Sequence, residues 1–246
     1  SLEGIETGSI DHVCIDPPYE ANVMYAECSD FFYVWMKRSL GSVFPDLFRD
    51  QLTNKDDEAV ANEARFAGFG RKKKPMAQSD YERKMAACFR EIHRVLSDDG
   101  VLTVMFTHKS VDAWDKLASS LIGAGFAIRS SWPVHTESEH SLHQAKKNAA
   151  QSTILLTCRK RAPGGEPVWW DELQGKVRQI AREKAKDFER QGIRGVDLYI
   201  STFGPTLALL SEQWPVLTSE MDEQGNPKPL RPEVALDLAR TEVVML

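Results

Sequence analysis

The sequence predicts an α/β fold in which helices cover a mostly parallel β-sheet. Short apolar runs typical of buried strands alternate with longer runs of helical periodicity, and this order is typical of parallel sheets. Two further strands, predicted at 126–134 and 152–158, follow each other without an intervening helix, so one of them should run antiparallel to the rest. The composition agrees, because 42% hydrophobic and 27% charged residues are typical of a globular protein.

The first predicted strand, DHVCI at 11–15, runs directly into the tetrapeptide DPPY at 16–19. The strand should end there, because proline has no N–H to donate to a ladder. Apolar and aromatic residues at 22–40 then predict a mostly buried helix with a break near Asp30.

Residues 41–78 predict an excursion from the core, part helix and part mobile loop. This segment holds an acidic run at 56–58, glycines at 68 and 70, and the basic run formed by Arg71, Lys72, Lys73 and Lys74.

A regular helix should follow the excursion, since Ser79 and Glu82 have the spacing of a capping box. The sequence DDG at 98–100 closes this helix, and the continuous apolar run at 101–106 predicts a fully buried strand. Ser110 can cap the next helix, which should end near Gly125.

The C-terminal part is predicted to be mainly helical. An amphipathic helix at 170–191 is followed by a helix, a hairpin with its turn at 224–227, and a last helix that Pro232 opens. We therefore expect one part at 1–161, with the insertion at 41–78, and a helical extension at 162–246.

Several classes of protein are excluded or disfavoured by the sequence. No apolar run approaches 18 residues and no signal peptide is present, so we expect a cytoplasmic protein without a membrane span. The four cysteines form no CxxC pair, which argues against a zinc ribbon and a disulfide framework. The loop histidines His135, His140 and His143 complete no known ligand pattern, so no metal is predicted. With a net charge of −5, nucleic acid could bind only to local patches.

The tetrapeptide at 16–19 has the groups needed to methylate an exocyclic amino group of a nucleobase. The nitrogen of such an amine is a poor nucleophile because its lone pair is delocalised into the ring. Two hydrogen-bond acceptors can localise that lone pair: the carboxylate of Asp16 and the main-chain carbonyl of Pro17, which Pro18 stiffens. The ring of Tyr19 can stack on a base extracted from a duplex. The alternative is a helix-entry turn that Asp16 caps.

Asp-Pro-Pro-Tyr after an apolar strand resembles motif IV of the S-adenosylmethionine-dependent amino-methyltransferases. The longer stretches "NVMYAECSDFFYVW", "RVLSDDGVLTVMFTHKSVDAW", "AGFAIRSSWPVHTE" and "QSTILLTCRKR" resemble the large adenine-specific DNA methylases that carry an N-terminal domain of unknown function. The likeness covers residues 10–161 well and the rest more loosely. It implies the C-terminal half of a Rossmann-like methyltransferase sheet and a flipped adenine in double-stranded DNA as substrate, with a restriction-modification role suggested.

Further roles are expected for Asp16 and for residues outside the tetrapeptide. Asp16 and Phe31 would lie beside S-adenosylmethionine. Three residues that follow the second strand, Thr107, His108 and Lys109, either edge the base pocket or only cap the strand. The basic run of four residues at 71–74 either contacts phosphates or is a solvated loop.

One departure from the family concerns the cofactor. Its members place a glycine-rich loop and an acidic ribose-binding residue before motif IV, and only ten residues precede the predicted strand here. Because the chain starts at Ser1, we expect a fragment, or one half of a split enzyme whose N-terminal half is supplied in cis or in trans. The competing functions are an RNA base methyltransferase and a non-catalytic nucleic-acid-binding subunit.

Overall fold

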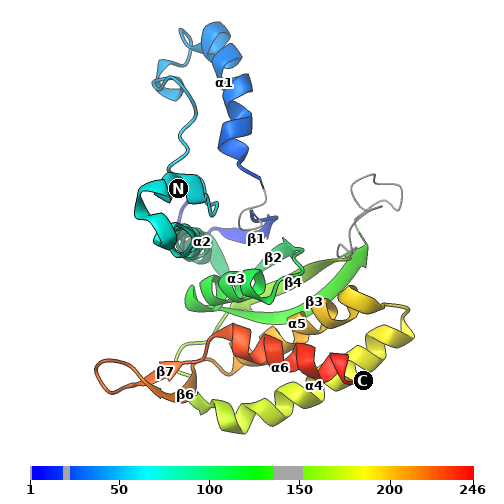
Figure 1. Ribbon diagram of the computed structural model, residues 1–246. Coiled ribbons are helices and arrows are strands. Elements are labelled where there is room, and N and C mark those ends of the chain that lie inside the picture. The colour runs from blue at the N-terminus through cyan, green and yellow to red at the C-terminus, as the bar shows by residue number, and fades with distance from the viewer. Residues whose placement is uncertain (1, 19–22, 136–151) are drawn as a thin grey trace. The chain divides into compact units, whose positions relative to one another are not determined.

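The structure is a computed structural model that describes residues 2–18, 23–135 and 152–246 (Figure 1). The chain divides into two compact units. The larger unit contains residues 1–17 and 86–246, and the smaller unit contains residues 18–85.

A four-stranded mixed sheet forms the centre of the larger unit (Figure 1). Its order is β1-β2-β4-β3, with the bounds β1 Ile10–Ile15, β2 Leu96–Phe106, β3 Phe126–His135 and β4 Ser152–Lys160. β1 pairs parallel with β2, whereas β4 pairs antiparallel with both β2 and β3. The predicted α/β fold with one antiparallel strand is therefore confirmed.

One face of this sheet is the core of the larger unit. Val104 and Phe106 of β2 are buried opposite Leu156 and Ile154 of β4, respectively, and directly opposite residues share a face. The helix α3 (Val111–Gly123) packs on this face, because the Trp114 ring meets the Phe106 ring edge-on at 4.9 Å.

The C-terminal helices belong to the same unit and pack on one another, and α5 also packs on β3. They are α4 (Trp170–Arg190), α5 (Gly195–Glu212) and α6 (Pro232–Val244), and a small sheet accompanies them, formed by β5 (Val168–Trp169), β6 (Val216–Met221) and β7 (Pro227–Pro229). The buried carboxylate of Asp115 on α3 accepts the Glu233 N–H at 2.8 Å and pairs with Arg231. The predicted helix, hairpin and helix are confirmed, while the functional boundary at Arg161 stays a prediction.

The closest approach in this packing is between α5 and β3. A Cβ atom added to Gly204 would lie 2.2 Å from both Cβ and Oγ of Ser131. Only glycine therefore allows the helix backbone to lie this close to the strand.

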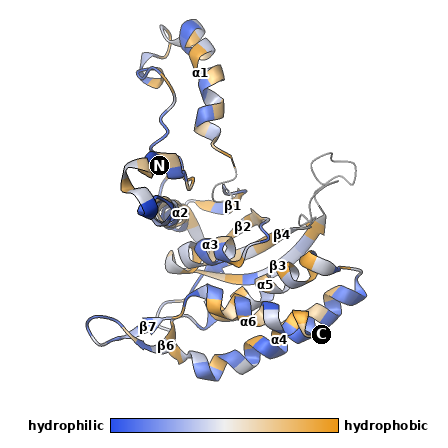
Figure 2. Ribbon diagram, viewed as in Figure 1, coloured by the Kyte–Doolittle hydropathy of each residue, from blue (hydrophilic) through white to orange (hydrophobic). Residues whose placement is uncertain are grey.

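The helix α4 is amphipathic, as the sequence predicts. Leu173, Val177 and Ala181 are buried along one side, and Figure 2 colours most of the remaining helix as hydrophilic. Arg178 and Arg182 on that polar side pair with Glu242 of α6, at 3.5 and 2.6 Å. Part of the basic face therefore holds two helices together.

The smaller unit consists of α1 (Tyr25–Leu40), the 3-10 helices η1 (Pro45–Leu47) and η2 (Glu63–Lys72), and the first half of α2 (Lys73–Val95). Polar contacts connect its helices and loops. The Asp30 carboxylate accepts the Thr53 N–H at 3.0 Å and pairs with Lys55 at 2.7 Å. The Asp80 carboxylate receives Arg65 at 3.3 Å and Lys84 at 2.9 Å.

Two predictions about α1 are wrong. The helix is continuous through Asp30, because that side chain leaves the helix to bind the following loop instead of interrupting the backbone. It is also not buried: no residue of α1 is buried among the residues that the structure describes, and Phe31 and Phe32 are each about two thirds exposed (66% and 65%).

Two predicted boundaries are also wrong. α2 begins at Lys73, so Ser79 lies inside the helix and does not form its cap. Pro75 lies in the first turn, where a missing N–H costs nothing, and the helix can therefore start early. β2 begins at Leu96, so the predicted helix-closing turn at 98–100 lies within the strand, beside an irregularity in its pairing with β1.

Candidate active site at the carboxyl end of β1

The carboxyl ends of β1 and β2 lie side by side at one edge of the main sheet. Ile15 is the last residue of β1 in register, and its partner is Val104. Asp16 is the residue directly after Ile15, and Thr107 comes three residues after Val104. Ligands of open α/β sheets bind at such an edge, outside the carboxyl ends of parallel strands.

The predicted catalytic tetrapeptide begins at this edge. Asp16 is exposed, Pro17 is buried and Pro18 is half-buried. The Pro18 carbonyl accepts a hydrogen bond of 2.7 Å from the hydroxyl of Tyr81, a fully buried side chain of α2. Tyr19 lies outside the described residues. Tyr81 is not predicted by the sequence, because no local pattern connects residues 63 positions apart.

The residues that follow β2 make hydrogen bonds at the end of that strand. The Thr107 hydroxyl donates to the Thr153 hydroxyl of β4 at 2.7 Å. The Nδ1 atom of His108 accepts the Ser110 N–H at 3.0 Å, and its carbonyl accepts the Trp114 indole N–H at 2.8 Å. Thr107 and His108 therefore make contacts of the strand-capping kind, which is one of the two roles considered for them. Lys109 is exposed.

Two other sets of predicted site residues lie in the smaller unit. Phe31 is exposed on α1, where its ring meets that of Phe32 edge-on at 5.4 Å. The basic run at 71–74 spans the end of η2 and the start of α2, and all four side chains are exposed. Asp16 and residues 107–109 therefore follow neighbouring strand ends of the larger unit, whereas Phe31 and the basic run belong to the smaller unit.

The surroundings of the basic run are aromatic. Phe66 and Phe69 lie 6.3 Å apart between ring centroids, and Phe69 is 56% exposed. Gly70 adopts φ +55°, a conformation that favours glycine, between Phe69 and Arg71. Lys73 pairs with Glu63 at 3.2 Å. This segment presents cations and one aromatic ring to solvent.

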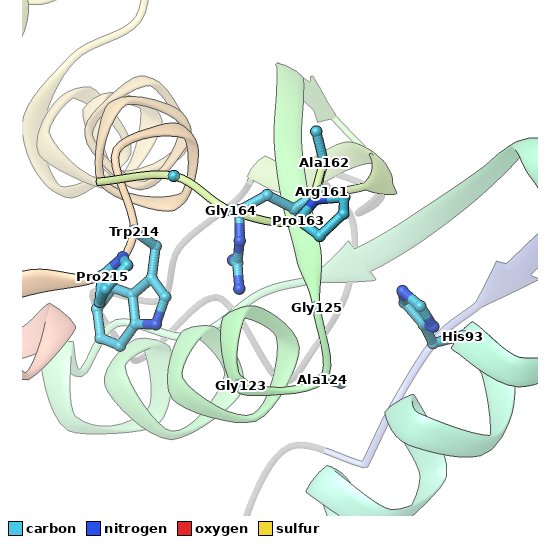
Figure 3. Close-up of a pocket in the computed structure, with 11 residues that line it drawn as sticks. His93, Gly123, Ala124, Gly125, Arg161, Ala162, Pro163, Gly164, Trp214 and Pro215 are labelled. Atoms are coloured by element: carbon cyan, nitrogen blue, oxygen red, sulfur yellow. The ribbon is translucent and has the colours of Figure 1, made fainter. Parts of the chain in front are cut away.

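A cavity of about 350 Å³ lies at the opposite edge of the sheet, where β2 begins and β4 ends (Figure 3). His93 and Trp214 lie on either side of it (Figure 3). The Arg161 guanidinium donates to the Ile122 and Phe126 carbonyls, each at 3.2 Å, and so caps the end of α3. Burial, and then the charges of Lys160 and Arg161, lower the pKa of His93. The cavity is separate from the strand ends that carry Asp16.

The described part of the chain contains neither a candidate metal site nor a helix that could span a membrane. Residues 2–18, 23–135 and 152–246 contain no cluster of His, Cys, Asp or Glu that could hold a metal ion, and His140 and His143 lie outside them. Every helix in the same ranges is too short or too polar for a membrane crossing.

A mixed α/β sheet with Asp-Pro-Pro after a parallel strand is the arrangement expected of an amino-methyltransferase. A sequence model of the DNA methylase family matches residues 10–224, and the chain belongs to that family. It is therefore a DNA amino-methyltransferase of the type that acts on N6 of adenine or N4 of cytosine. No curated protein and no solved structure matches the chain.

Proposed function

We propose that the chain transfers a methyl group from S-adenosylmethionine to the N6 amine of a flipped adenine in double-stranded DNA. The observation that supports this most is the position of Asp16, which leaves the carboxyl end of a parallel strand in a DNA methylase. There the carboxylate is exposed and can meet a base that has been turned out of the duplex.

The proposed chemistry needs two acceptors and one platform. The Asp16 carboxylate accepts one hydrogen of the amine and the Pro17 carbonyl accepts the other, which localises the lone pair on the nitrogen. Tyr19 stacks on the base and holds it flat, an interaction worth roughly 1–3 kcal/mol. No strong base is required, because the amine proton becomes acidic once the methyl group is attached.

S-adenosylmethionine is the proposed methyl donor, and its chemistry is to supply an electrophilic methyl group. Asp16 and Phe31 are the residues of this chain that we assign to its binding. They account for part of a cofactor site, since Asp16 can meet polar groups near the strand end and Phe31 can pack on an apolar surface.

The rest of the cofactor site requires a partner segment in this proposal. β1 is the edge strand of the main sheet, and its outer side pairs with no other strand within the described residues. Ile10, Val13 and Ile15 of this strand are half-buried, and its unpaired N–H and C=O groups can pair with a further strand. We propose that the N-terminal half of the catalytic domain, in cis or in trans, pairs with β1.

The DNA backbone is the proposed ligand of the basic run at 71–74 in the smaller unit. Four exposed cations next to the exposed Phe69 suit a strand of phosphates with bases beside it. Thr107, His108 and Lys109 are proposed to edge the base pocket, with Lys109 as the exposed cation of that edge.

The test is product analysis with the full-length protein, S-adenosylmethionine and unmethylated DNA. Nuclease digestion and mass spectrometry should detect N6-methyladenine. N4-methylcytosine would overturn the assignment to adenine, and preferential methylation of RNA would overturn DNA as the substrate. No methylated base in any substrate would overturn the proposed activity.

A further inference from the structure

We infer that Tyr81 is a positioning residue of the active site, which anchors the end of the segment Asp16-Pro17-Pro18 through the Pro18 carbonyl. The inference rests on the proposed function of that tetrapeptide. Its observation is the 2.7 Å hydrogen bond from the Tyr81 hydroxyl to the Pro18 carbonyl oxygen, with the Tyr81 side chain only 1% exposed.

Proline chemistry leaves one main-chain dihedral angle free in the segment from Asp16 to Pro18. Each proline ring fixes its own φ, and a residue that precedes a proline is restricted to extended ψ values. Asp16 and Pro17 both precede a proline, so their ψ angles are restricted. Pro18 precedes Tyr19, so its ψ angle is not restricted in this way.

The Tyr81 hydroxyl acts on that free angle. Rotation about ψ of Pro18 turns its carbonyl oxygen, which a hydrogen bond to a buried, immobile phenol holds in one direction. Because the prolines make residues 16–18 stiff, anchoring the Pro18 carbonyl also limits movement of the Asp16 and Pro17 main chain.

The bond also distinguishes the two proline carbonyls. One acceptor position of the Pro18 carbonyl is engaged by Tyr81. This agrees with the assignment of the Pro17 carbonyl as the acceptor for the substrate amine, since a catalytic acceptor has to face the base.

Misplaced reacting groups are costly, since an error near 1 Å can reduce the rate about 100-fold. We expect Tyr81→Phe in the full-length enzyme to reduce kcat by about 10- to 100-fold. The KM for DNA should change by less than about twofold, because the phenol does not contact the phosphates.

Tyr33→Phe is the matched control. The Tyr33 hydroxyl of α1 donates to the Asp50 carbonyl at 3.0 Å, so this variant also removes a tyrosine-to-carbonyl bond within the smaller unit. It should leave kcat unchanged. Equal reductions of kcat in both variants would overturn the inference, and so would a wild-type kcat for Tyr81→Phe.

Amide hydrogen exchange gives a readout that does not depend on activity. A peptide covering residues 12–25 should exchange faster in Tyr81→Phe than in wild type and in Tyr33→Phe, at equal thermal stability. Unchanged exchange in that peptide would overturn the inference even if the wild-type protein methylated no DNA. Absence of methylation by the wild type would instead overturn the proposed function.

Discussion

At the scale of single residues, the site depends on how Asp16 leaves its strand. The sequence predicts this position, because an apolar run followed by two prolines is a local pattern. The contact between Tyr81 and Pro18 could not be predicted, because Tyr81 has the ordinary pattern of a buried helix residue and its partner is 63 positions away. A local pattern predicts the reacting groups, whereas the contacts that hold them depend on tertiary packing.

We expect Asp16→Ala in the complete enzyme to lower kcat by about 10²–10³-fold or more, the range found when one preorganised polar group is lost at a reacting centre. DNA affinity should stay the same, because the carboxylate acts on the amine. Asp11→Ala is the control, since Asp11 is also exposed on β1 and its carboxylate accepts a 3.2 Å bond from the Ser97 hydroxyl. Wild-type turnover by the Asp16 variant would contradict the assigned role.

At the scale of elements, α1 shows that the spacing of apolar residues does not establish whether a helix is buried. Its aromatic and apolar residues predict burial, yet the described part of the smaller unit leaves the helix exposed. Periodicity records that a face is apolar, and a second element has to cover it. The sequence predicts the strands more closely, because β4 buries the alternate residues Ile154, Leu156 and Cys158 and turn signals lie nearby.

The basic run is an element whose role can be measured. Replacing all four residues at 71–74 with Ala should flatten the dependence of log affinity for DNA on log salt, by about 0.9 for each phosphate that these side chains neutralise. A control variant with the same change of charge replaces four exposed cations of α4: Lys176, Lys184, Lys186 and Arg190. Equal slopes for wild type and the 71–74 variant would show that these four side chains contact no phosphate and form only a solvated surface.

The packing of α5 on β3 gives a stability prediction at the same scale. Gly204→Ala should destabilise the protein by about 1–3 kcal/mol, the usual cost of overpacking, because the new methyl group would overlap Ser131. Gly175→Ala on α4 is the control, since nothing lies within 4 Å of its added Cβ. That variant should gain up to about 1 kcal/mol from helix propensity. Urea unfolding measures both, and an equal or higher stability of the Gly204 variant would contradict the tight packing.

At the scale of the whole molecule, the open side of β1 should govern how the chain associates. We expect the purified 246-residue chain to self-associate through this edge under reducing conditions, because unpaired strand edges template pairing. Cys14→Lys should weaken the association, since a charged side chain on an edge opposes pairing. Cys88→Lys, at an exposed position of α2, is the control. Light scattering that shows a wild-type monomer at high concentration would contradict the prediction.

The placement of β4 between β2 and β3 also has a consequence for synthesis of the protein. β2 ends at Phe106 and β3 ends at His135, but the strand that separates them begins only at Ser152. While a ribosome makes the chain, β2 and β3 thus emerge before either can acquire the neighbour they share. At about 5–20 residues per second, this interval lasts several seconds. The sheet closes by insertion of its last-made strand, so a nascent chain paused before β4 exposes two unsatisfied strand edges to chaperones.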